Sequence, residues 1–143
     1  MAQICIGLDL GTYSAKAIVL ERSFRSTEVK SVHEVLVEGE GNEARTKALG
    51  AVIEEVRQPG ALYGVALDGE RVALRIFSLP FSDSRRINQV LPAEIEASLP
   101  FELDEIVFDH HVISRAIDGS KVLVAAAKQE DVGKLLHEYG EIQ

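Results

Sequence analysis

Cysteine, tryptophan and proline are scarce in this sequence of 143 residues, which has one cysteine, no tryptophan and four prolines. A single cysteine excludes a disulfide framework within a monomer and is typical of a protein in a reducing, cytoplasmic setting. We interpret Cys5, which lies inside the first apolar run, as a small buried hydrophobic residue.

Basic residues and long apolar runs are also few. The chain has 15 Lys and Arg against 23 Asp and Glu, and its formal net charge is −8. Nucleic-acid and anionic lipid surfaces are bound by clustered basic residues, so this balance argues against nucleic acid and against direct membrane contact. No run approaches the roughly 20 apolar residues of a membrane span, and the first three residues lack a basic leader. We therefore expect any link to a membrane to come from a partner or from chain outside these residues.

Alternating strand and helix patterns predict an α/β fold with no long linker and no internal repeat. Strands are expected at 4–10, 15–21, 27–38, 62–67, 71–79, 105–114 and 121–127, and helices at 42–58, 83–98 and 129–139. Asn42 is the predicted cap of the first helix, and Ser82 or Asp83 that of the second. Pro92 should kink or divide the second helix. The run 122–127 is apolar almost throughout, as in a central strand.

The segment Gly7-Leu8-Asp9-Leu10-Gly11-Thr12-Tyr13-Ser14-Ala15-Lys16 is the first chemical signal. An acidic residue ends a buried strand, and a glycine lets the turn approach a ligand closely. Hydroxyls and backbone N–H groups at such a tip can hold a phosphate while the aspartate organises Mg²⁺. The alternative is a plain hairpin turn with a capping aspartate.

Asp-Leu-Gly-Thr at the tip of a first hairpin resembles the first phosphate motif of actin, hexokinase and the heat-shock chaperones. The resemblance implies that Asp9 is the metal-side carboxylate, that Gly11, Thr12 and Ser14 lie near the phosphates, and that Lys16 is the matching basic position. That superfamily closes its nucleotide site with loops from a second lobe, which these residues do not contain. We therefore expect a vestigial or half site, no cofactor in this chain alone, and ATP with Mg²⁺ only when a second lobe is present.

A second signal runs through residues 75–111. Arg75 and Leu79-Pro80-Phe81 lead to Arg85-Arg86, then to Glu94, Glu96 and Leu99-Pro100-Phe101, and Val107-Phe108-Asp109-His110-His111 begins the next strand. This order resembles the inserted subdomain of two related families. One is the L protein (GspL) of the type II secretion system, and the other is the PilM-like actin homologue of type IV pilus assembly.

The resemblance implies an actin-like (ASKHA, ribonuclease H-like) first lobe with an inserted β-α-β-β subdomain. Residues 1–69 and 128–143 would form the incomplete actin-like subdomain 1A, and residues 70–127 the insert. The L protein is favoured by the double arginine after Leu79-Pro80-Phe81 and by the Glu94/Glu96 pair. Many L proteins have lost the Asp-Gly-Thr pattern of the first hairpin, however, whereas this chain keeps it, so the PilM-like family stays open.

The L protein resemblance implies a non-enzymatic scaffold at the cytoplasmic face of the bacterial inner membrane. Its partners would be the secretion ATPase (the type II secretion E protein) and the inner-membrane platform proteins, with a homodimer as an open alternative. The PilM-like alternative would bind ATP and the cytoplasmic peptide of an inner-membrane pilus protein. A third alternative is part of an actin-fold small-molecule kinase, which needs a catalytic aspartate outside these residues.

We expect the partner surface to include Arg75, Arg85, Arg86, Glu94, Glu96 and Phe101, with no catalytic and no metal-binding residue. Glu94 and Glu96 are two apart and point to different sides of a helix, which argues against a catalytic pair. His110 and His111 are adjacent on a strand and face opposite ways, which argues against a shared metal. The stretch 99–101 either packs on the core or presents an apolar knob.

Overall fold

A computed structural model describes residues 2–140 of the chain. It divides into two units, one before and one after the boundary between Leu67 and Asp68. The elements are β1 (Gln3–Leu10), β2 (Ser14–Arg22), β3 (Thr27–Leu36), α1 (Gly41–Val56), β4 (Leu62–Val65), β5 (Val72–Leu79), α2 (Ser84–Ser98), β6 (Ile106–Ala116), β7 (Gly119–Lys128) and α3 (Gln129–Gly140). Short 3₁₀ turns at Gly69–Arg71 and Leu103–Glu105 precede β5 and β6. The α/β class predicted from the sequence is confirmed, with three helices and two sheets.

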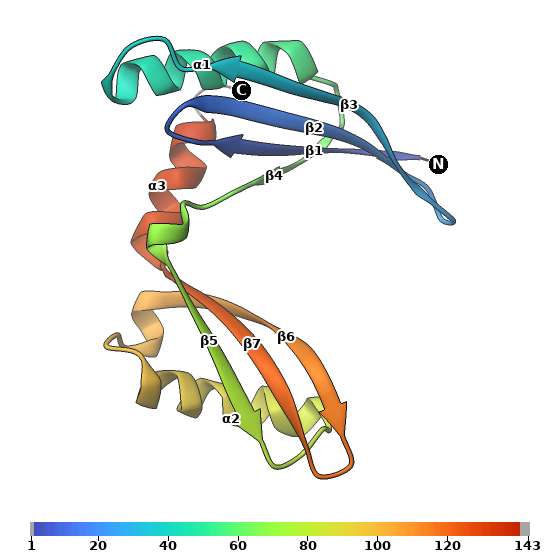
Figure 1. The fold of residues 1–143 in the computed structure, drawn as a ribbon, viewed down its shortest axis with the longest axis vertical. Coiled ribbons are helices and arrows are strands. Elements are labelled where there is room, and N and C mark those ends of the chain that lie inside the picture. Colours follow the sequence, from blue (N-terminus) through green and yellow to red (C-terminus); the bar gives the residue numbers. More distant parts are fainter. Residues whose placement is uncertain (1, 141–143) are drawn as a thin grey trace. The chain divides into compact units, whose positions relative to one another are not determined.

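The first unit is a four-stranded sheet in the order β3-β2-β1-β4 with α1 against one face (Figure 1). β1 is antiparallel to β2 and parallel to β4, so α1 lies in the connection that returns the chain to the sheet. Strand residues alternate between faces, and the buried ones of β1 and β2 face the buried residues of α1. These core residues are Ile6, Leu8, Leu10, Ala15, Ala17, Val19, Ala48, Leu49, Val52, Ile53 and Val56.

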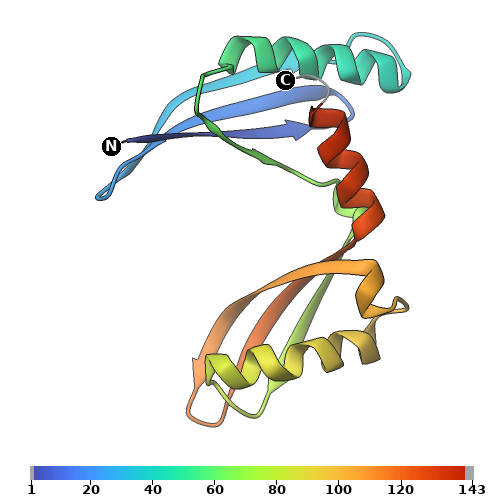
Figure 2. The same ribbon diagram turned by 180° about the vertical axis from the view of Figure 1, so that it is seen from behind.

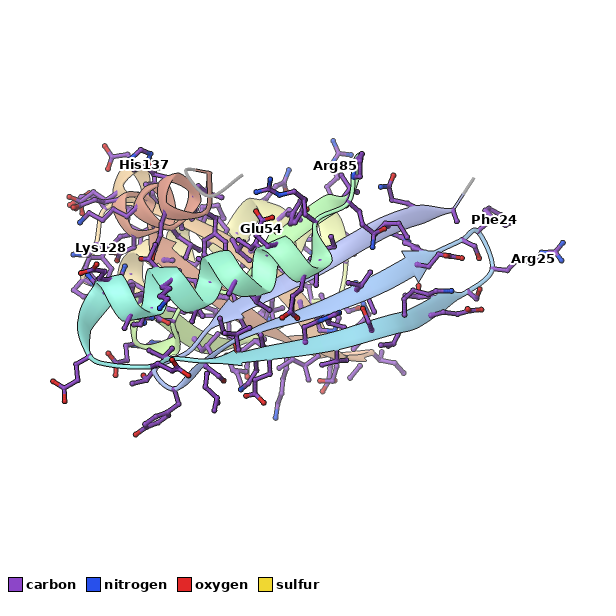
Figure 3. The ribbon with its side chains drawn as sticks, turned by 90° about the horizontal axis from the view of Figure 1, so that it is seen from above. Phe24, Arg25, Glu54, Arg85, Lys128 and His137 are labelled. Carbon is purple, nitrogen blue, oxygen red and sulfur yellow. The ribbon has the colours of Figure 1, made fainter. Side chains whose placement is uncertain are left out.

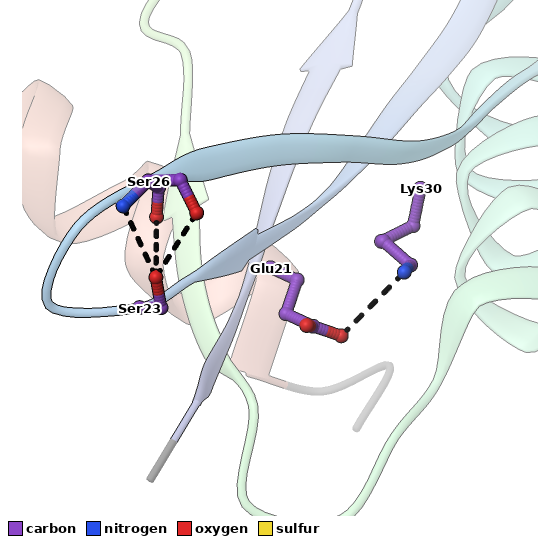
Figure 4. Close-up of polar contacts among 4 residues, drawn as sticks. All are labelled: Glu21, Ser23, Ser26 and Lys30. Atoms are coloured by element: carbon purple, nitrogen blue, oxygen red, sulfur yellow. Dashed lines mark hydrogen bonds and ion pairs between the residues drawn. The ribbon is translucent and has the colours of Figure 1, made fainter.

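The hairpin between β2 and β3 is closed by its own serines. The N–H of Ser23 donates to the carbonyl of Ser26 at 2.8 Å, and the Ser23 hydroxyl bonds to Ser26 as well. Further along the hairpin, Lys30 and Glu21 form an exposed ion pair at 3.7 Å (Figure 4). The turn residues Phe24 and Arg25 project from the tip, and the Phe24 side chain is fully exposed (Figure 3).

The second unit is an antiparallel three-stranded sheet in the order β5-β7-β6, with α2 along one face (Figure 2). Ile87, Leu91 and Ile95 recur at helical spacing on α2 and are at most 1% exposed. They pack against Val122 and Val124 of β7. Burying each of these side chains contributes about 1.5–3 kcal/mol. The contact between these three residues and β7 therefore holds α2 on the sheet.

Three local expectations are corrected. Asn42 does not cap α1, because the helix begins at Gly41, after Glu40 and with positive φ at Gly39 and Gly41. Of the two outcomes expected at Pro92, a kink or a division of the helix, the division is wrong, because α2 is continuous from Ser84 to Ser98. Pro92 removes one backbone donor, but the buried side of the helix holds both halves on one sheet. Cys5 is only half-buried, because it lies on the sheet face away from α1.

The predicted division of the chain differs from the two units in its treatment of α3. Residues of α3 group with the second unit, whereas the prediction assigned residues 128–143 to the first; the last three of these lie outside the described residues. The predicted assignment rests on resemblance to a family, whereas the two units are defined by contacts in space. The contacts do not test the assignment, so it stays a prediction.

Candidate nucleotide-binding and partner-binding sites

The tip of the β1–β2 hairpin holds the five residues predicted to line a nucleotide half site. Asp9 and Lys16 are exposed and lie directly opposite each other in the β1–β2 register, on the face away from α1. Thr12 is exposed in the turn. The Gly11 N–H donates to the Ser14 carbonyl at 2.9 Å and closes the turn. The structure therefore brings an acid, a base and a hydroxyl to one tip.

Ser14 is bound differently from the other four. Its hydroxyl is buried and donates to the Glu34 carboxylate of β3 at 2.7 Å. That bond ties the start of β2 to its neighbouring strand, and the role of Ser14 in a nucleotide half site stays a prediction. A Cβ at Gly11 would lie 3.2 Å from the Ser14 carbonyl oxygen, so a side chain there would force the turn to shift slightly.

Arg45 is a residue near this tip that the sequence reasoning missed. It projects from α1, and its Nη2 donates to the Leu10 carbonyl at 3.2 Å. Its Nε is buried and has no hydrogen-bond partner among the described residues. A guanidinium supports the end of the strand that carries Asp9. Only knowledge of how α1 crosses the sheet could have placed it there.

The six residues of the predicted partner surface all lie in the second unit. Arg85 and Arg86 are exposed in the first turn of α2, where Asp83 caps the helix by accepting the Arg86 N–H at 2.9 Å. The Arg86 guanidinium lies 5.0 Å from the centre of the Phe81 ring. The arginines therefore extend from a helix end that Asp83 fixes. Of the two predicted caps, Ser82 and Asp83, the structure has Asp83.

The remaining four occupy three places. Glu94 and Glu96 are exposed on either side of the buried Ile95 of α2. Arg75 is exposed on β5, with its Nη1 on the Leu74 carbonyl at 2.9 Å. Phe101 is packed against the core of the second unit, which decides in favour of core packing for the stretch that begins with Leu99.

Phe101 also lines a pocket of the second unit, of about 200 Å³. Its apolar wall includes Leu99 and Ile106. The Lys128 ammonium lies 4.8 Å from the centre of the Phe101 ring, and Arg71 pairs with Asp131 across 3.7 Å at the rim. An apolar floor between charged rims suits one apolar side chain of a peptide better than a small polar substrate.

The charges continue onto α3, where Lys134 bonds to Glu130 one turn earlier. This hydrogen bond, with the Lys134 charge, lowers the pKa of the exposed Glu130 carboxyl below its ordinary value. Such an i,i+4 pair supports the helix modestly.

The second sheet has an open face that the sequence reasoning did not foresee. β7 is the central strand, as its apolar run predicted, but only alternate residues are covered by α2. Leu123 and Ala125 on the other face are half-buried, and Leu74 and Ile76 of β5 beside them are 57% and 61% exposed. The continuous apolar run predicted a central strand, and it does not distinguish a strand covered on one face from one covered on both.

Residues 2–140 contain no group of three or more His, Cys, Asp and Glu side chains that could hold a metal ion. His110 and His111 alternate on β6, opposite Val124 and Leu123 respectively. No helix in the described part of the chain is both long enough and apolar enough to cross a membrane.

Comparison with known proteins gives a likeness in fold. No protein-family model and no curated protein matches the sequence. The structure is similar to the cytoplasmic domain of EpsL, an inner-membrane component of the type II secretion system of Vibrio cholerae, with a TM-score of 0.56 and 18% sequence identity. The match covers 98% of this chain and 53% of that chain, so the chain spans about half the length of the EpsL domain. The resemblance to the type II secretion L protein predicted from residues 75–111 is thus confirmed as a likeness of fold to a type II secretion component.

Proposed function

We propose that this chain is the first part of a cytoplasmic scaffold domain of the type II secretion inner-membrane platform and that it recruits the secretion ATPase. One observation carries the proposal: the likeness to the EpsL cytoplasmic domain extends over 98% of the chain and therefore through both units. The motifs of residues 75–111 give separate support, because their order resembles the inserted subdomain that the L protein shares with the PilM-like family, and the double arginine and the Glu94/Glu96 pair favour the L protein. In this proposal the protein acts at the cytoplasmic face of the inner membrane and is not an enzyme.

The finer architecture belongs to the same proposal. The first unit would be an actin-like first lobe, and residues 70–127 its inserted subdomain. The hairpin, parallel β4 and α1 of the first unit support that view, since a β-β-β-α-β order opens the actin-like superfamily as the sequence resemblance has it. In this proposal Asp9, Gly11, Thr12, Ser14 and Lys16 are a vestigial or half nucleotide site.

The surface of α2 supports a protein partner. Arg85, Glu94 and Glu96 are exposed, and α2 itself is fixed by its buried side. Charged residues on a rigid helix can select a partner of complementary charge without being needed for folding. The pocket at Phe101 would take an apolar side chain beside them.

The test is calorimetry of this chain with the N-terminal region of the cognate secretion ATPase. We expect a complex with a Kd of about 1 μM or tighter. Arg85→Glu and the double variant Glu94→Lys with Glu96→Lys should each weaken it about tenfold or more while leaving the unfolding temperature unchanged. Glu28→Lys, an exposed charge change on β3 of the first unit, is the matched control and should bind like the wild type.

The PilM-like function is the second candidate, and the retained Asp9-Leu10-Gly11-Thr12 favours it. Absence of an ATPase complex, together with binding of a pilus protein's cytoplasmic peptide once a second lobe is present, would replace the first proposal by this one. If the protein phosphorylated a small molecule with a turnover in the usual enzyme range of about 1–1000 per second, the kinase function would replace both scaffold proposals.

A further inference from the structure

A second pocket of the second unit, of about 380 Å³, lies between α2 and β6, and no part of the proposed function uses it. Ser84 and Asn88, one turn apart on α2, line one side. The other side is lined by β6 residues, namely His110, His111, Val112 and Arg115. Small-molecule sites begin at about 300 Å³, so the volume is sufficient for a small ligand.

A β-bulge directs the cation of this pocket toward α2. His110 and Val112 lie on the face of β6 that α2 covers, each opposite a buried valine of β7. Regular alternation would next place Ser114 on that face. Instead the register shifts after Val112, and Arg115 lies opposite the buried Ser120. Bulges at sheet edges commonly re-aim a side chain at a functional site, and here the bulge brings a guanidinium into the pocket.

Arg115 is held in position through two of its N–H groups. Its Nη1 donates to the Ser82 carbonyl, and its Nη2 donates to the Ser84 hydroxyl at 2.9 Å. A guanidinium has five N–H donors in one plane, so about three remain for a ligand. Because the Ser84 oxygen accepts from Arg115, its own proton can point to the same ligand. The arginine is therefore fixed before a ligand binds, which lowers the entropic cost of binding.

Every polar side chain that lines the pocket can donate a hydrogen bond, and no carboxylate is among the lining residues. Besides the arginine and the serine, the donors are the Asn88 amide and the imidazoles of His110 and His111. A metal ion needs acceptors, and a neutral sugar needs acceptors as well as donors. Donors alone, with one fixed cation, suit an anion.

The acids beside the pocket in the sequence are directed to backbone N–H groups. Asp83 accepts the Arg86 N–H at 2.9 Å, and Asp109 accepts the N–H of the histidine that follows it at 2.7 Å. Arg85 is exposed in the same first turn of α2. Three arginines, with Arg115, thus stand against two aspartates here, although the whole chain has a net charge of −8.

A phosphate group suits this arrangement better than a carboxylate does. One guanidinium fork already satisfies both oxygens of a carboxylate, whereas a phosphate group has three strong acceptor oxygens. The pocket offers donors from two sides, with Arg115 on β6 and Ser84 and Asn88 on α2.

We propose that the pocket between α2 and β6 binds a phosphate group, either of a small phosphate ester or as the free ion. Arg115 is its fixed cation, and Ser84, Asn88 and His110 are its further donors. The inference goes beyond the proposed recruitment of an ATPase and does not depend on it, because the ligand is a small molecule.

An NMR titration of the 143-residue chain with inorganic phosphate and, separately, with glycerol phosphate tests the pocket. We expect saturable shifts of the amide signals of Ser84 and Arg115, with a Kd of about 1 mM or tighter for at least one of the two probes. The probe with the lower Kd identifies the source of the phosphate group. Sodium chloride at the same ionic strength should not reproduce the shifts, because it screens charges without filling the pocket.

Two amide-to-acid variants separate the pocket from the rest of α2. Asn88→Asp places a carboxylate against the phosphate and should raise the Kd about tenfold or more. Gln89→Glu, the same change at the next exposed residue of α2, does not touch the pocket and should bind like the wild type. Both side chains are exposed, so both variants should unfold at the wild-type temperature.

Arg115→Gln should abolish saturable binding, whereas Arg25→Gln, at the exposed tip of the β2–β3 hairpin, should not. Shifts that grow without saturation up to about 20 mM of either probe, or an equal Kd in Asn88→Asp and the wild type, overturn the proposal. Cosedimentation with phosphatidylglycerol vesicles in the absence of binding to either small probe also overturns it, because the pocket would then belong to a membrane surface.

Discussion

Gly119 begins β7 directly beside the backbone at the end of β5. A Cβ on Gly119 would lie 2.6 Å from the Leu79 carbonyl oxygen, and a backbone atom cannot move aside as a side chain can. Gly119→Ala should therefore lower the free energy of unfolding by about 1–3 kcal/mol, measured by urea denaturation. Gly133→Ala is the control, because a Cβ on that glycine of α3 meets open space. It should leave stability unchanged or raise it by up to about 1 kcal/mol, and equal losses in both variants would contradict the steric argument.

Ile95 separates residues that hold α2 in place from residues that a partner could bind. It is fully buried between the exposed Glu94 and Glu96. Ile95→Ala should destabilise the chain by about 2–5 kcal/mol because it leaves a cavity under the helix. Glu96→Ala should change stability by no more than about 0.5 kcal/mol. Thermal or urea unfolding of the two variants measures these changes. A large loss of stability in Glu96→Ala would mean that this carboxylate has a structural role.

At the scale of the element, Pro92 gives a prediction about the stability of α2. It lies inside α2, lacks the N–H that would bond to the Asn88 carbonyl, and costs up to about 3 kcal/mol relative to alanine. Asn88 is exposed, so water can bond to its carbonyl and recover part of that cost. Pro92→Ala should therefore raise the free energy of unfolding by about 1–2 kcal/mol, measured in urea. A destabilised variant would contradict this. It would mean that the packing lost with the proline ring is worth more than the hydrogen bond gained.

The elements themselves were largely predictable from the sequence. Alternation placed the strands and helical spacing placed α2, because both patterns express burial of one face. The ends were less predictable. Asn42 has the chemistry of a cap, but Gly39 and Gly41, with φ of 111° and 84°, let the chain turn into α1 with Glu40 at the cap position, two residues earlier. A side-chain preference of about 1 kcal/mol does not override such a turn.

The open face of β7 shows why burial was harder to predict than the strand. An apolar run is expected of a strand covered on both sides, and Val122 and Val124 are indeed buried under α2. Leu123 and Ala125 point the other way, where no element of the second unit packs within the described residues. The residue types show that the strand can be buried on both faces. Whether each face is in fact covered depends on elements that are distant in the sequence.

At the scale of the molecule, each unit has a sheet covered on one face by its own helix. The nucleotide-like motif lies in the first unit, and the proposed partner surfaces lie in the second. A nucleotide site needs groups converging on the phosphates from more than one side. The hairpin tip supplies Asp9, Thr12 and Lys16, while Ser14 is already bonded to Glu34. We therefore expect binding to partners to survive changes at the tip.

The last prediction concerns ATP and this chain alone. At 1 mM ATP with Mg²⁺, a Kd of about 1 mM would add about 0.4 kcal/mol of stability, which is about 1–2 °C in Tm. We expect a smaller shift, because one hydroxyl of the half site is engaged inside the hairpin. Differential scanning fluorimetry measures it, with Asp118→Ala as a matched exposed aspartate control for Asp9→Ala. A shift above about 5 °C that Asp9→Ala abolishes and Asp118→Ala retains would show that the tip binds nucleotide without a second lobe, and would favour the PilM-like function over the secretion scaffold.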